Sequence, residues 1–201
     1  MGRPAVFLDR DGTVVREAEY LRSPRGMRLL PRAAAAIRRL NEAGFAVVMA
    51  TNQSGMARGL LTEDDLEEIH GVLRRRLARG GARVDGVYFC PHHPEAARRE
   101  YRRRCRCRKP APGMLLRAAK ELDLDLSRCY AVGDSERDIE AGRRAGCRTV
   151  LVRSGYGAET EGRVGDGLGA DHIADDLAGA VAWILGRERE QGRARKRPAG
   201  R

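Results

Sequence analysis

The chain has 201 residues, of which 42% are hydrophobic and only 4% aromatic, as in one globular domain with an aliphatic core. No apolar run approaches the roughly 20 residues of a membrane span, and the N-terminus lacks the long apolar stretch of a signal peptide. The composition excludes membrane, collagen-like and disulfide-framework classes. We therefore expect a cytoplasmic protein with no membrane partner.

The net charge of +11 suggests nucleic acid as a partner, but the distribution of the charge argues against it. Most of the excess lies in residues 98–109, with eight basic side chains and one acid, and at the C-terminal end. The remainder is nearly neutral, and aromatic residues for stacking on bases are scarce. We interpret residues 1–186 as the folded domain and residues 187–201 as a basic, disordered tail, and we expect a monomer.

Short apolar runs alternate with longer amphipathic segments along the domain. The pattern predicts strands over residues 4–8, 45–50, 84–90, 129–133, 148–152 and 170–174. It predicts helices over residues 31–43, 62–79, 113–122 and 136–145, and from 175 or 176 through 183. Strands that alternate with helices pair in parallel through right-handed crossovers. The sequence therefore predicts a three-layer, Rossmann-like α/β fold.

Three polar clusters follow predicted strands, at residues 9–13, 51–55 and 133–138. In a parallel sheet such segments meet at the carboxyl edge, where ligands bind. Asp9 and Asp11 are two residues apart, so their side chains point to the same side of an extended chain. Neighbouring carboxylates repel unless a cation or a proton lies between them. Mg²⁺ suits carboxylate and carbonyl oxygens, and Asp134 supplies a third carboxylate.

These residues carry a resemblance to a known family. FLDRDGTV at residues 7–14 resembles the DxDGT signature of the haloacid dehalogenase-like phosphatases. TNQSG at residues 51–55 resembles their second motif, Lys109 the third and GDSERD at residues 133–138 the fourth. The four motifs occur in order between residues 5 and 153. The resemblance implies a Mg²⁺-dependent phosphatase, and the length of the chain leaves no room for a large cap domain.

The resemblance also implies a role for each motif residue. Asp9 attacks phosphorus and forms an aspartyl-phosphate, and Asp11 protonates the leaving group and then activates water. Mg²⁺ is bound by the carboxylates of Asp9 and Asp134 and by the backbone carbonyl of Asp11. Thr51 hydrogen-bonds a phosphoryl oxygen, and Lys109 neutralises charge on the transferring group.

Cys90, His92, Cys105 and Cys107 form a ligand set of the kind that binds structural zinc. Three thiolates and one imidazole complete a tetrahedron, which leaves no position for a substrate. His93 is an alternative to His92, and the resemblance to the family favours His92. Zinc is expected to anchor the loop that carries Lys109.

The cysteine-rich loop is similar to that of the heptose bisphosphate phosphatase subfamily and to that of the histidinol-phosphate phosphatases beside it. We expect removal of the C7 phosphate of D-glycero-D-manno-heptose 1,7-bisphosphate; the alternatives are histidinol phosphate hydrolysis and a nucleic-acid 3′-phosphatase or binding protein. Arg108 favours a bisphosphate over the cationic histidinol phosphate. The resemblance places substrate contacts at Glu17, Tyr20, Thr51, Asn52, Gln53, Ser54, Arg108 and Lys109.

Two residues of the fourth motif are less determined. Ser135 departs from the subfamily, which often has a lysine directly after the metal-binding aspartate. Asp138 has two equally supported roles, either orienting Lys109 or capping the helix that begins at Glu136.

Overall fold

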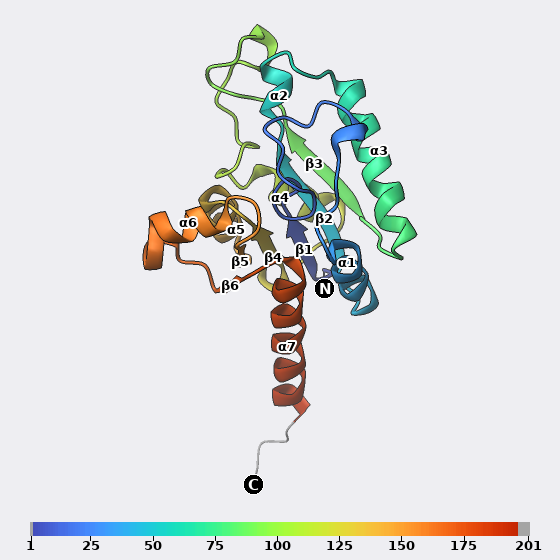
Figure 1. Cartoon of the computed structure of the whole chain (residues 1–201). Coiled ribbons are helices and arrows are strands. Elements are labelled where there is room, and N and C mark those ends of the chain that lie inside the picture. Colours follow the sequence, from blue (N-terminus) through green and yellow to red (C-terminus); the bar gives the residue numbers. More distant parts are fainter. Residues whose placement is uncertain (1, 197–201) are drawn as a thin grey trace.

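The computed structural model describes residues 2–196. Within them lies one six-stranded sheet with the strand order β3-β2-β1-β4-β5-β6 (Figure 1). Every neighbouring pair of strands is parallel. The strands are β1 (Ala5–Leu8), β2 (Ala46–Asn52), β3 (Gly86–Cys90), β4 (Tyr130–Gly133), β5 (Arg148–Val152) and β6 (His172–Ala174).

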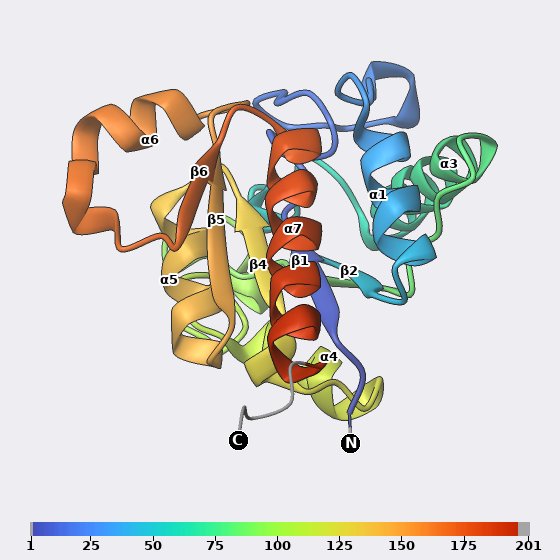
Figure 2. The same cartoon turned by 90° about the horizontal axis from the view of Figure 1, so that it is seen from below.

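Helices cover both faces of the sheet (Figure 2). Helices α1, α3 and α7 pack on one face, and α4 and α5 pack on the other. The helices are α1 (Ala33–Glu42), α2 (Ser54–Ala57), α3 (Glu63–Arg79), α4 (Gly113–Glu121), α5 (Glu136–Ala145), α6 (Gly157–Val164) and α7 (Leu177–Lys196). The predicted three-layer α/β fold is confirmed.

The central strand shows why both faces need a helical layer. All four side chains of β1 are buried, and successive side chains point to opposite faces. Val6 and Leu8 join the core beneath α1 and α7, whereas Ala5 and Phe7 join the core beneath α4. A strand that is apolar on both sides is typical of a parallel sheet enclosed by helices.

Capping residues set the ends of two helices where the sequence predicts them. The Thr62 hydroxyl accepts a hydrogen bond from the Asp65 backbone N–H at 3.1 Å, and the Asp65 carboxylate accepts one from the Thr62 N–H at 2.7 Å. This capping box begins α3. Helix α5 ends at Gly146, whose φ of +85° suits glycine.

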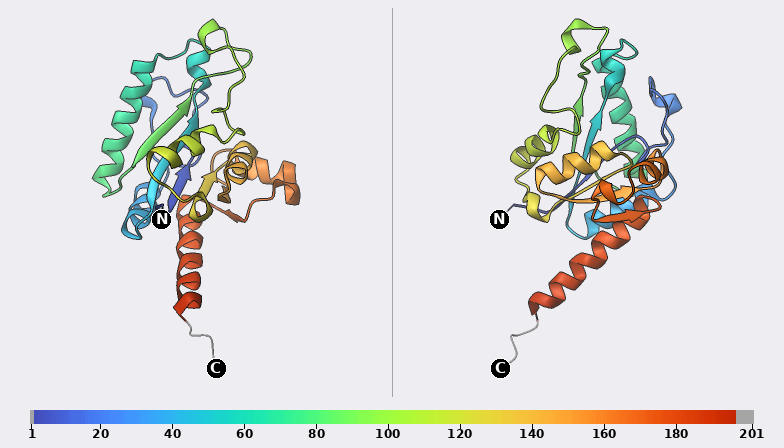
Figure 3. Two further views of the ribbon diagram at one scale, coloured as in Figure 1. Left: turned by 180° about the vertical axis from the view of Figure 1, so that it is seen from behind. Right: turned by 90° about the vertical axis from the view of Figure 1, so that its left-hand side faces the viewer.

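Three helices differ from the prediction. Helices α2 and α6 lie in segments for which no element was predicted. Helix α7, predicted to end at Trp183, continues to Lys196 and projects from the body of the molecule (Figure 3). Ten residues of the tail predicted as disordered are therefore helical, and residues 197–201 lie outside the described part of the chain.

Contacts with the body explain the longer α7. The hydroxyl of Tyr130 on β4 donates a hydrogen bond to Glu188 at 2.8 Å. Within α7, the Arg187 guanidinium lies 5.6 Å from the centre of the Trp183 ring. The segment is also rich in Arg, Glu, Gln and Ala, which favour helix. The prediction gave too much weight to the net charge.

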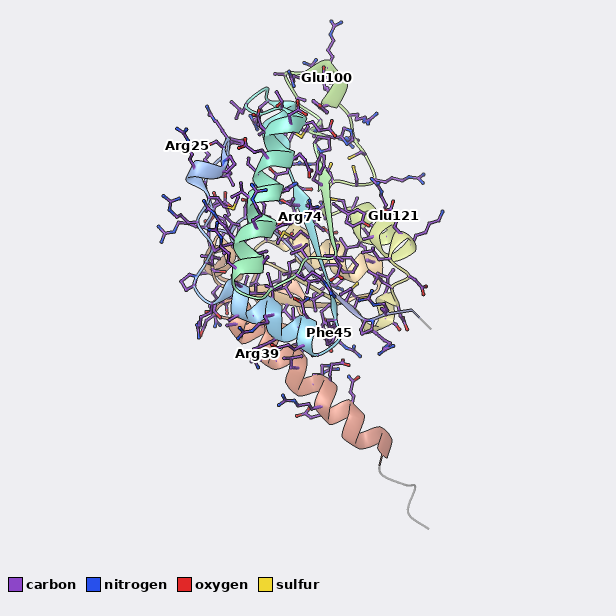
Figure 4. The ribbon with its side chains drawn as sticks, turned by 90° about the vertical axis from the view of Figure 1, so that its right-hand side faces the viewer. Arg25, Arg39, Phe45, Arg74, Glu100 and Glu121 are labelled. Atoms are coloured by element: carbon purple, nitrogen blue, oxygen red, sulfur yellow. The ribbon has the colours of Figure 1, made fainter. Side chains whose placement is uncertain are left out.

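Outward helix faces carry charged side chains. Figure 4 shows Arg39 on α1, Arg74 on α3 and Glu121 on α4, all exposed, whereas Phe45 is buried. Among the helices of residues 2–196, none combines the length and the apolar character that crossing a bilayer requires.

The strand register brings the three polar clusters together. Leu8 at the end of β1 lies opposite Met49 of β2 and Val132 of β4. Asp9, Thr51 and Asp134 therefore emerge at the same edge. The strand order reverses between β1 and β4, and such a switch point is where open α/β sheets bind ligands.

Candidate active site

Two carboxylates meet at the switch point. Asp9 follows β1 directly and donates its backbone N–H to Val132 at 3.0 Å, and Asp134 follows β4. Carboxylate oxygens of Asp9, Asp134 and Asp138 lie within 4.8 Å of one another. Burial, together with the neighbouring carboxylates, raises the pKa of Asp9 to about 6, although Lys109 opposes the shift.

The environment of Asp134 fits a divalent cation. Burial and the charges of Asp9 and Asp138 raise its pKa to about 8. Glycines keep side chains away from its Oδ2 atom: a Cβ would lie 1.9 Å from this oxygen at Gly12 and 2.1 Å at Gly155. Oxygen donors with excess negative charge suit Mg²⁺. Gly155 was not predicted as a site residue, because it follows β5, whereas the three predicted polar clusters follow β1, β2 and β4.

The Lys109 ammonium group makes three buried contacts. Its Nζ lies 2.8 Å from Asp9 Oδ1, 2.5 Å from Asp138 Oδ1 and 2.7 Å from the carbonyl oxygen of Ala50. Burial lowers the pKa of Lys109, whereas the carboxylates of Asp138 and Asp9 together raise it by more. The net shift is therefore upward. Lys109 is therefore cationic and points at the predicted nucleophile.

Asp138 fulfils both of its alternative roles. Its Oδ1 atom pairs with Lys109, and its Oδ2 atom accepts a hydrogen bond from the Ser135 backbone N–H at 3.0 Å. The Ser135 hydroxyl donates to the same oxygen. The Ser135 side chain therefore faces the helix cap.

Arg10 holds the carboxylate of Asp11. Its Nε atom donates to Asp11 Oδ1 at 3.0 Å, and its Nη2 atom donates to Oδ2 at 2.7 Å. Gln53 Nε2 also donates to Oδ2, at 3.2 Å. Arg10 is only 1% exposed and contacts the His70 ring at 3.4 Å. This fork fixes the orientation of the Asp11 carboxylate, which is not part of the group formed by Asp9, Asp134 and Asp138.

Sequence reasoning missed Arg10, because an ideal strand would place it opposite the two aspartates. His70 on α3 is buried beside Arg10. Burial and the charges of Arg10 and Arg74 lower its pKa to about 3. It is therefore a neutral neighbour of the Arg10 guanidinium.

The second motif contributes mainly to positioning. Thr51 is buried, and its Oγ1 accepts a hydrogen bond from Gln53 at 2.8 Å. The Asn52 amide donates to the Lys109 carbonyl and accepts from the Lys109 N–H, both at 3.1 Å. Protein groups engage the amides of Asn52 and Gln53, and both residues also line the cavity in which we expect them to contact substrate. Ser54 begins α2 and lines the pocket.

A cavity of about 350 Å³ opens beside these groups. The predicted substrate residues Glu17, Tyr20 and Arg108 line it. Burial and the charges of Asp11 and Asp9 raise the pKa of Glu17 to about 7. Sequence reasoning missed other lining residues, because no motif spacing marks them: Arg58, His93, Arg137 and Tyr156.

The predicted metal ligands of the loop also come together. Sγ–Sγ distances are 3.5 Å for Cys90–Cys105 and 3.2 Å for both Cys90–Cys107 and Cys105–Cys107. His92 Nδ1 lies 3.4 Å from Cys107 and 3.6 Å from Cys90. His93, the alternative ligand, accepts a hydrogen bond from the Glu95 N–H instead and lines the cavity of about 350 Å³. Three thiols and one imidazole at these separations fit a tetrahedral metal site.

Comparisons with known proteins agree with this geometry. A family model described as HAD-hydrolase-like matches residues 106–180. The D-glycero-D-manno-heptose-1,7-bisphosphate 7-phosphatase of Thermosynechococcus vestitus is 45% identical over 189 residues, which cover 92% of this chain and 96% of that protein. The D-glycero-beta-D-manno-heptose-1,7-bisphosphate 7-phosphatase of Escherichia coli K12 is 43% identical over 153 residues, which cover 76% and 80%.

A solved structure extends the likeness to three dimensions. The D,D-heptose 1,7-bisphosphate phosphatase of B. bronchiseptica, complexed with magnesium and phosphate, has a TM-score of 0.82 and 40% identity, covering 92% of this chain and 99% of that one. The chain therefore belongs to the D-glycero-D-manno-heptose-1,7-bisphosphate 7-phosphatase family of haloacid dehalogenase-like hydrolases.

Proposed function

We propose that the protein removes the C7 phosphate of D-glycero-D-manno-heptose 1,7-bisphosphate in a Mg²⁺-dependent reaction. The observation that carries this proposal is the meeting of Asp9, Lys109 and Asp134 at the switch point, in a chain 45% identical to a phosphatase of that name. The relative in complex with magnesium and phosphate supports the metal and the phosphoryl group.

Asp9 is the nucleophile in this proposal. Its carboxylate oxygen bonds to phosphorus as the bond from phosphorus to the sugar oxygen breaks, which gives an aspartyl-phosphate and a free sugar hydroxyl. Lys109, 2.8 Å away, compensates the negative charge on the carboxylate and on the phosphoryl oxygens. Mg²⁺ held by the carboxylates of Asp9 and Asp134 and the backbone carbonyl of Asp11 would stabilise charge on the phosphoryl group.

Asp11 transfers the protons. Its carboxyl group protonates the departing sugar oxygen and then takes a proton from the water that attacks the aspartyl-phosphate. That second step regenerates Asp9 and releases inorganic phosphate. The Arg10 fork and the Gln53 amide keep the Asp11 carboxylate in place between the two steps. The Thr51 hydroxyl is placed to hydrogen-bond a phosphoryl oxygen.

We propose zinc for the cysteine–histidine cluster. The donor set is the usual one for a structural zinc, and all four positions are filled by protein. Burial and the Arg103 charge lower the pKa of His92, which favours the neutral ring that binds metal. Cys107 lies two residues before Lys109, so the metal fixes the loop from one side while Asn52 holds it from the other.

The substrate is tested by phosphate release from a panel of phosphorylated sugars and histidinol phosphate. Heptose 1,7-bisphosphate is expected to give the highest kcat/KM. A higher value for histidinol phosphate would overturn the substrate assignment and favour the second candidate. The positive charge of Arg108, which lines the cavity, would repel the cationic amine of histidinol phosphate. The relatives are also named as heptose bisphosphate phosphatases, and both observations weigh against that candidate.

A further inference from the structure

Helix α6, which lies at the β6 end of the sheet, is docked with little apolar burial (Figure 2). Of its residues Gly157–Val164, only Gly157 and Thr160 are buried, and glycine has no side chain to pack. Val164 is half-buried against a small cluster that includes Ile139 and Leu151. Apolar packing thus holds the C-terminal end of α6, and a different contact must hold its first turn.

That contact is a hydrogen bond between Thr160 and Asp134. The Thr160 side chain is 3% exposed, and its hydroxyl donates to the backbone carbonyl of Asp134 at 3.0 Å. A threonine inside a helix often bonds a carbonyl of its own preceding turn, but this hydroxyl bonds a different segment of the chain. A buried hydroxyl without a partner costs free energy. The beginning of α6 is therefore fixed to the residue that follows β4.

The loop that leads into α6 contacts the same residue a second time. The backbone N–H of Tyr156 donates to Asp134 Oδ2 at 2.9 Å. Gly155 has a φ of +60° and passes so close that a Cβ there would lie 2.5 Å from the Cα of Gly12. Asp134 is thus held at its carbonyl by α6 and at its carboxylate by the loop before α6.

Ser154 extends these contacts to the loop after β1. Its hydroxyl donates to the backbone carbonyl of Gly12 at 2.7 Å. Only the two backbone dihedrals of Gly12 separate this carbonyl from that of Asp11, which is a proposed Mg²⁺ ligand. Ser154 therefore restrains the turn that presents the Asp11 carbonyl.

Arg153 anchors the beginning of the same segment. Its guanidinium donates to Glu161 on α6 at 2.7 and 2.9 Å, and to Asp175 at 2.7 Å. A guanidinium bonded through two nitrogens to one carboxylate has a fixed orientation. Residues 154–160 are therefore tied to α6 itself and form a fixed support for Asp134 and Gly12.

We propose that Ser154 and Thr160 are positioning residues of the Mg²⁺ site. Thr160 fixes the main chain of Asp134, Ser154 fixes the turn at Gly12, and neither side chain is itself a ligand. The inference rests on the proposed function, which names the ligands, and deepens it with two residues outside the four motifs. Hydrogen bonds that orient metal ligands strengthen the binding of the metal. By linkage, the bound metal in turn stabilises α6.

The test measures the Mg²⁺ dissociation constant of Thr160→Val by isothermal titration calorimetry. Valine keeps the shape of threonine but lacks the hydroxyl, so Asp134 loses a restraint and the dissociation constant should rise roughly tenfold. Thr160→Ser keeps the hydroxyl and should stay within about threefold of the wild type. The Mg²⁺ concentration for half-maximal phosphate release should rise with the dissociation constant, while kcat at saturating Mg²⁺ stays within about twofold.

Thr149→Val is the matched control. Thr149 on β5 is also buried, but its hydroxyl donates to Asp171 at 3.2 Å, and Asp171 is not one of the grouped carboxylates. This variant should lower the melting temperature and leave the Mg²⁺ dissociation constant unchanged. A purely structural Thr160 would behave in the same way. An unchanged constant in Thr160→Val, or an equal rise in both valine variants, would therefore overturn its positioning role.

Ser154→Ala tests the second positioning residue independently, and it keeps the proposal testable if Thr160→Val does not fold. Its Mg²⁺ dissociation constant should also rise, by roughly three- to tenfold. An unchanged constant would overturn the role of Ser154.

Failure of the proposed function would give different results. Binding of Mg²⁺ does not depend on which phosphate ester is hydrolysed, so a wild type inactive on heptose 1,7-bisphosphate would overturn the substrate alone. A wild type that binds no Mg²⁺ would overturn the metal site and the positioning role together. Wild-type binding that both variants retain unchanged would overturn only the positioning role.

Discussion

Asp138 connects the N-terminus of α5 to the ammonium group of Lys109. One carboxylate oxygen lies 2.5 Å from Lys109 Nζ, while the other accepts the Ser135 backbone N–H at 3.0 Å. Both side chains of the ion pair are 5% exposed. The helix cap thereby fixes the direction of the cation, and the cation lies against the carboxylate that is proposed to attack phosphorus.

Replacing Asp138 should therefore affect both stability and catalysis. Asp138→Asn retains an oxygen for the cap but removes a negative charge beside a buried cation. We expect a loss of about 3 kcal/mol in the free energy of unfolding and at least a roughly tenfold fall in kcat. Urea unfolding and phosphate release measure the two effects.

The chain provides a matched control in Asp65, which has the same position in the capping box of α3 but no ion pair within the described residues. Asp65→Asn should cost no more than about 1 kcal/mol and leave kcat unchanged. Equal destabilisation by the two variants would show that the contact with Lys109 contributes nothing beyond the cap.

Asp9→Asn should reduce turnover to the background rate while the protein remains folded. An amide is a poor nucleophile for phosphorus, so the aspartyl-phosphate does not form. The check is phosphate release by purified variant, with circular dichroism to establish the fold; Asp64→Asn on α3 serves as a control for the change in charge. Activity within roughly tenfold of wild type would contradict the assignment of the nucleophile.

The bounds of an element were predicted best where the residues that begin and end it are its neighbours in the sequence. Helix α5 has the predicted bounds, Glu136–Ala145, because Ser135 and Gly146 are sequence neighbours of its ends. The length of α7 depends instead on contacts of Glu188 with a distant strand. Such contacts cannot be read from composition or local pattern.

The same distinction holds in the site. Asp9, Asp11 and Asp134 belong to motifs with fixed spacing beside strands, and the topology brings them to one edge. Arg58 and Arg137 reach the pocket from segments that are adjacent only in the folded protein. Arg10 lies between two predicted site residues, yet its burial depends on how the chain turns after β1, which alternation along a strand does not describe.

The buried His70 predicts a pH dependence of stability. Its pKa is about 3 in the folded protein and near the ordinary value of 6.5 in the unfolded chain. The unfolded chain therefore binds a proton that the folded protein does not. Its contribution to stability is complete above pH 6.5 and is lost as the pH falls toward 3, by up to about 1.4 kcal/mol per pH unit.

Other carboxyl groups titrate in the same range, so the useful quantity is a difference between proteins. His70→Leu should unfold with a shallower dependence on pH between 6.5 and 4.5 than the wild type, as measured by urea unfolding at several pH values. Parallel curves for the two proteins would mean that His70 is protonated in the folded state.

The purified protein should hold one tightly bound zinc per chain, in addition to exchangeable Mg²⁺. The separations among Cys90, His92 and Cys107 motivate this expectation. Cys107→Ser should lower the zinc content, the melting temperature and kcat, because the loop that carries Lys109 loses its anchor. Elemental analysis of protein purified without chelator or metal-affinity resin gives the stoichiometry, and Cys147→Ser, at a buried cysteine outside the ligand set, is the control. A wild-type protein with no zinc would contradict the assignment.

Arg108 provides the last test, because it links the metal-binding loop to the substrate. Its guanidinium donates a hydrogen bond to the carbonyl oxygen of His92 at 3.1 Å and lines the cavity next to Lys109. A side chain fixed in this way can extend past the reacting phosphate to the distal one. Arg108→Ala should therefore lower kcat/KM on heptose 1,7-bisphosphate by roughly ten- to hundredfold, since a charge-assisted contact contributes on the order of 1.5–3 kcal/mol. Heptose 7-phosphate, which lacks the distal group, should be little affected. Arg106→Ala removes an exposed cation from the same loop and should change neither value. Equal losses on the two substrates would mean that Arg108 serves the reacting phosphate or the loop, and the support it gives to a bisphosphate substrate would be lost.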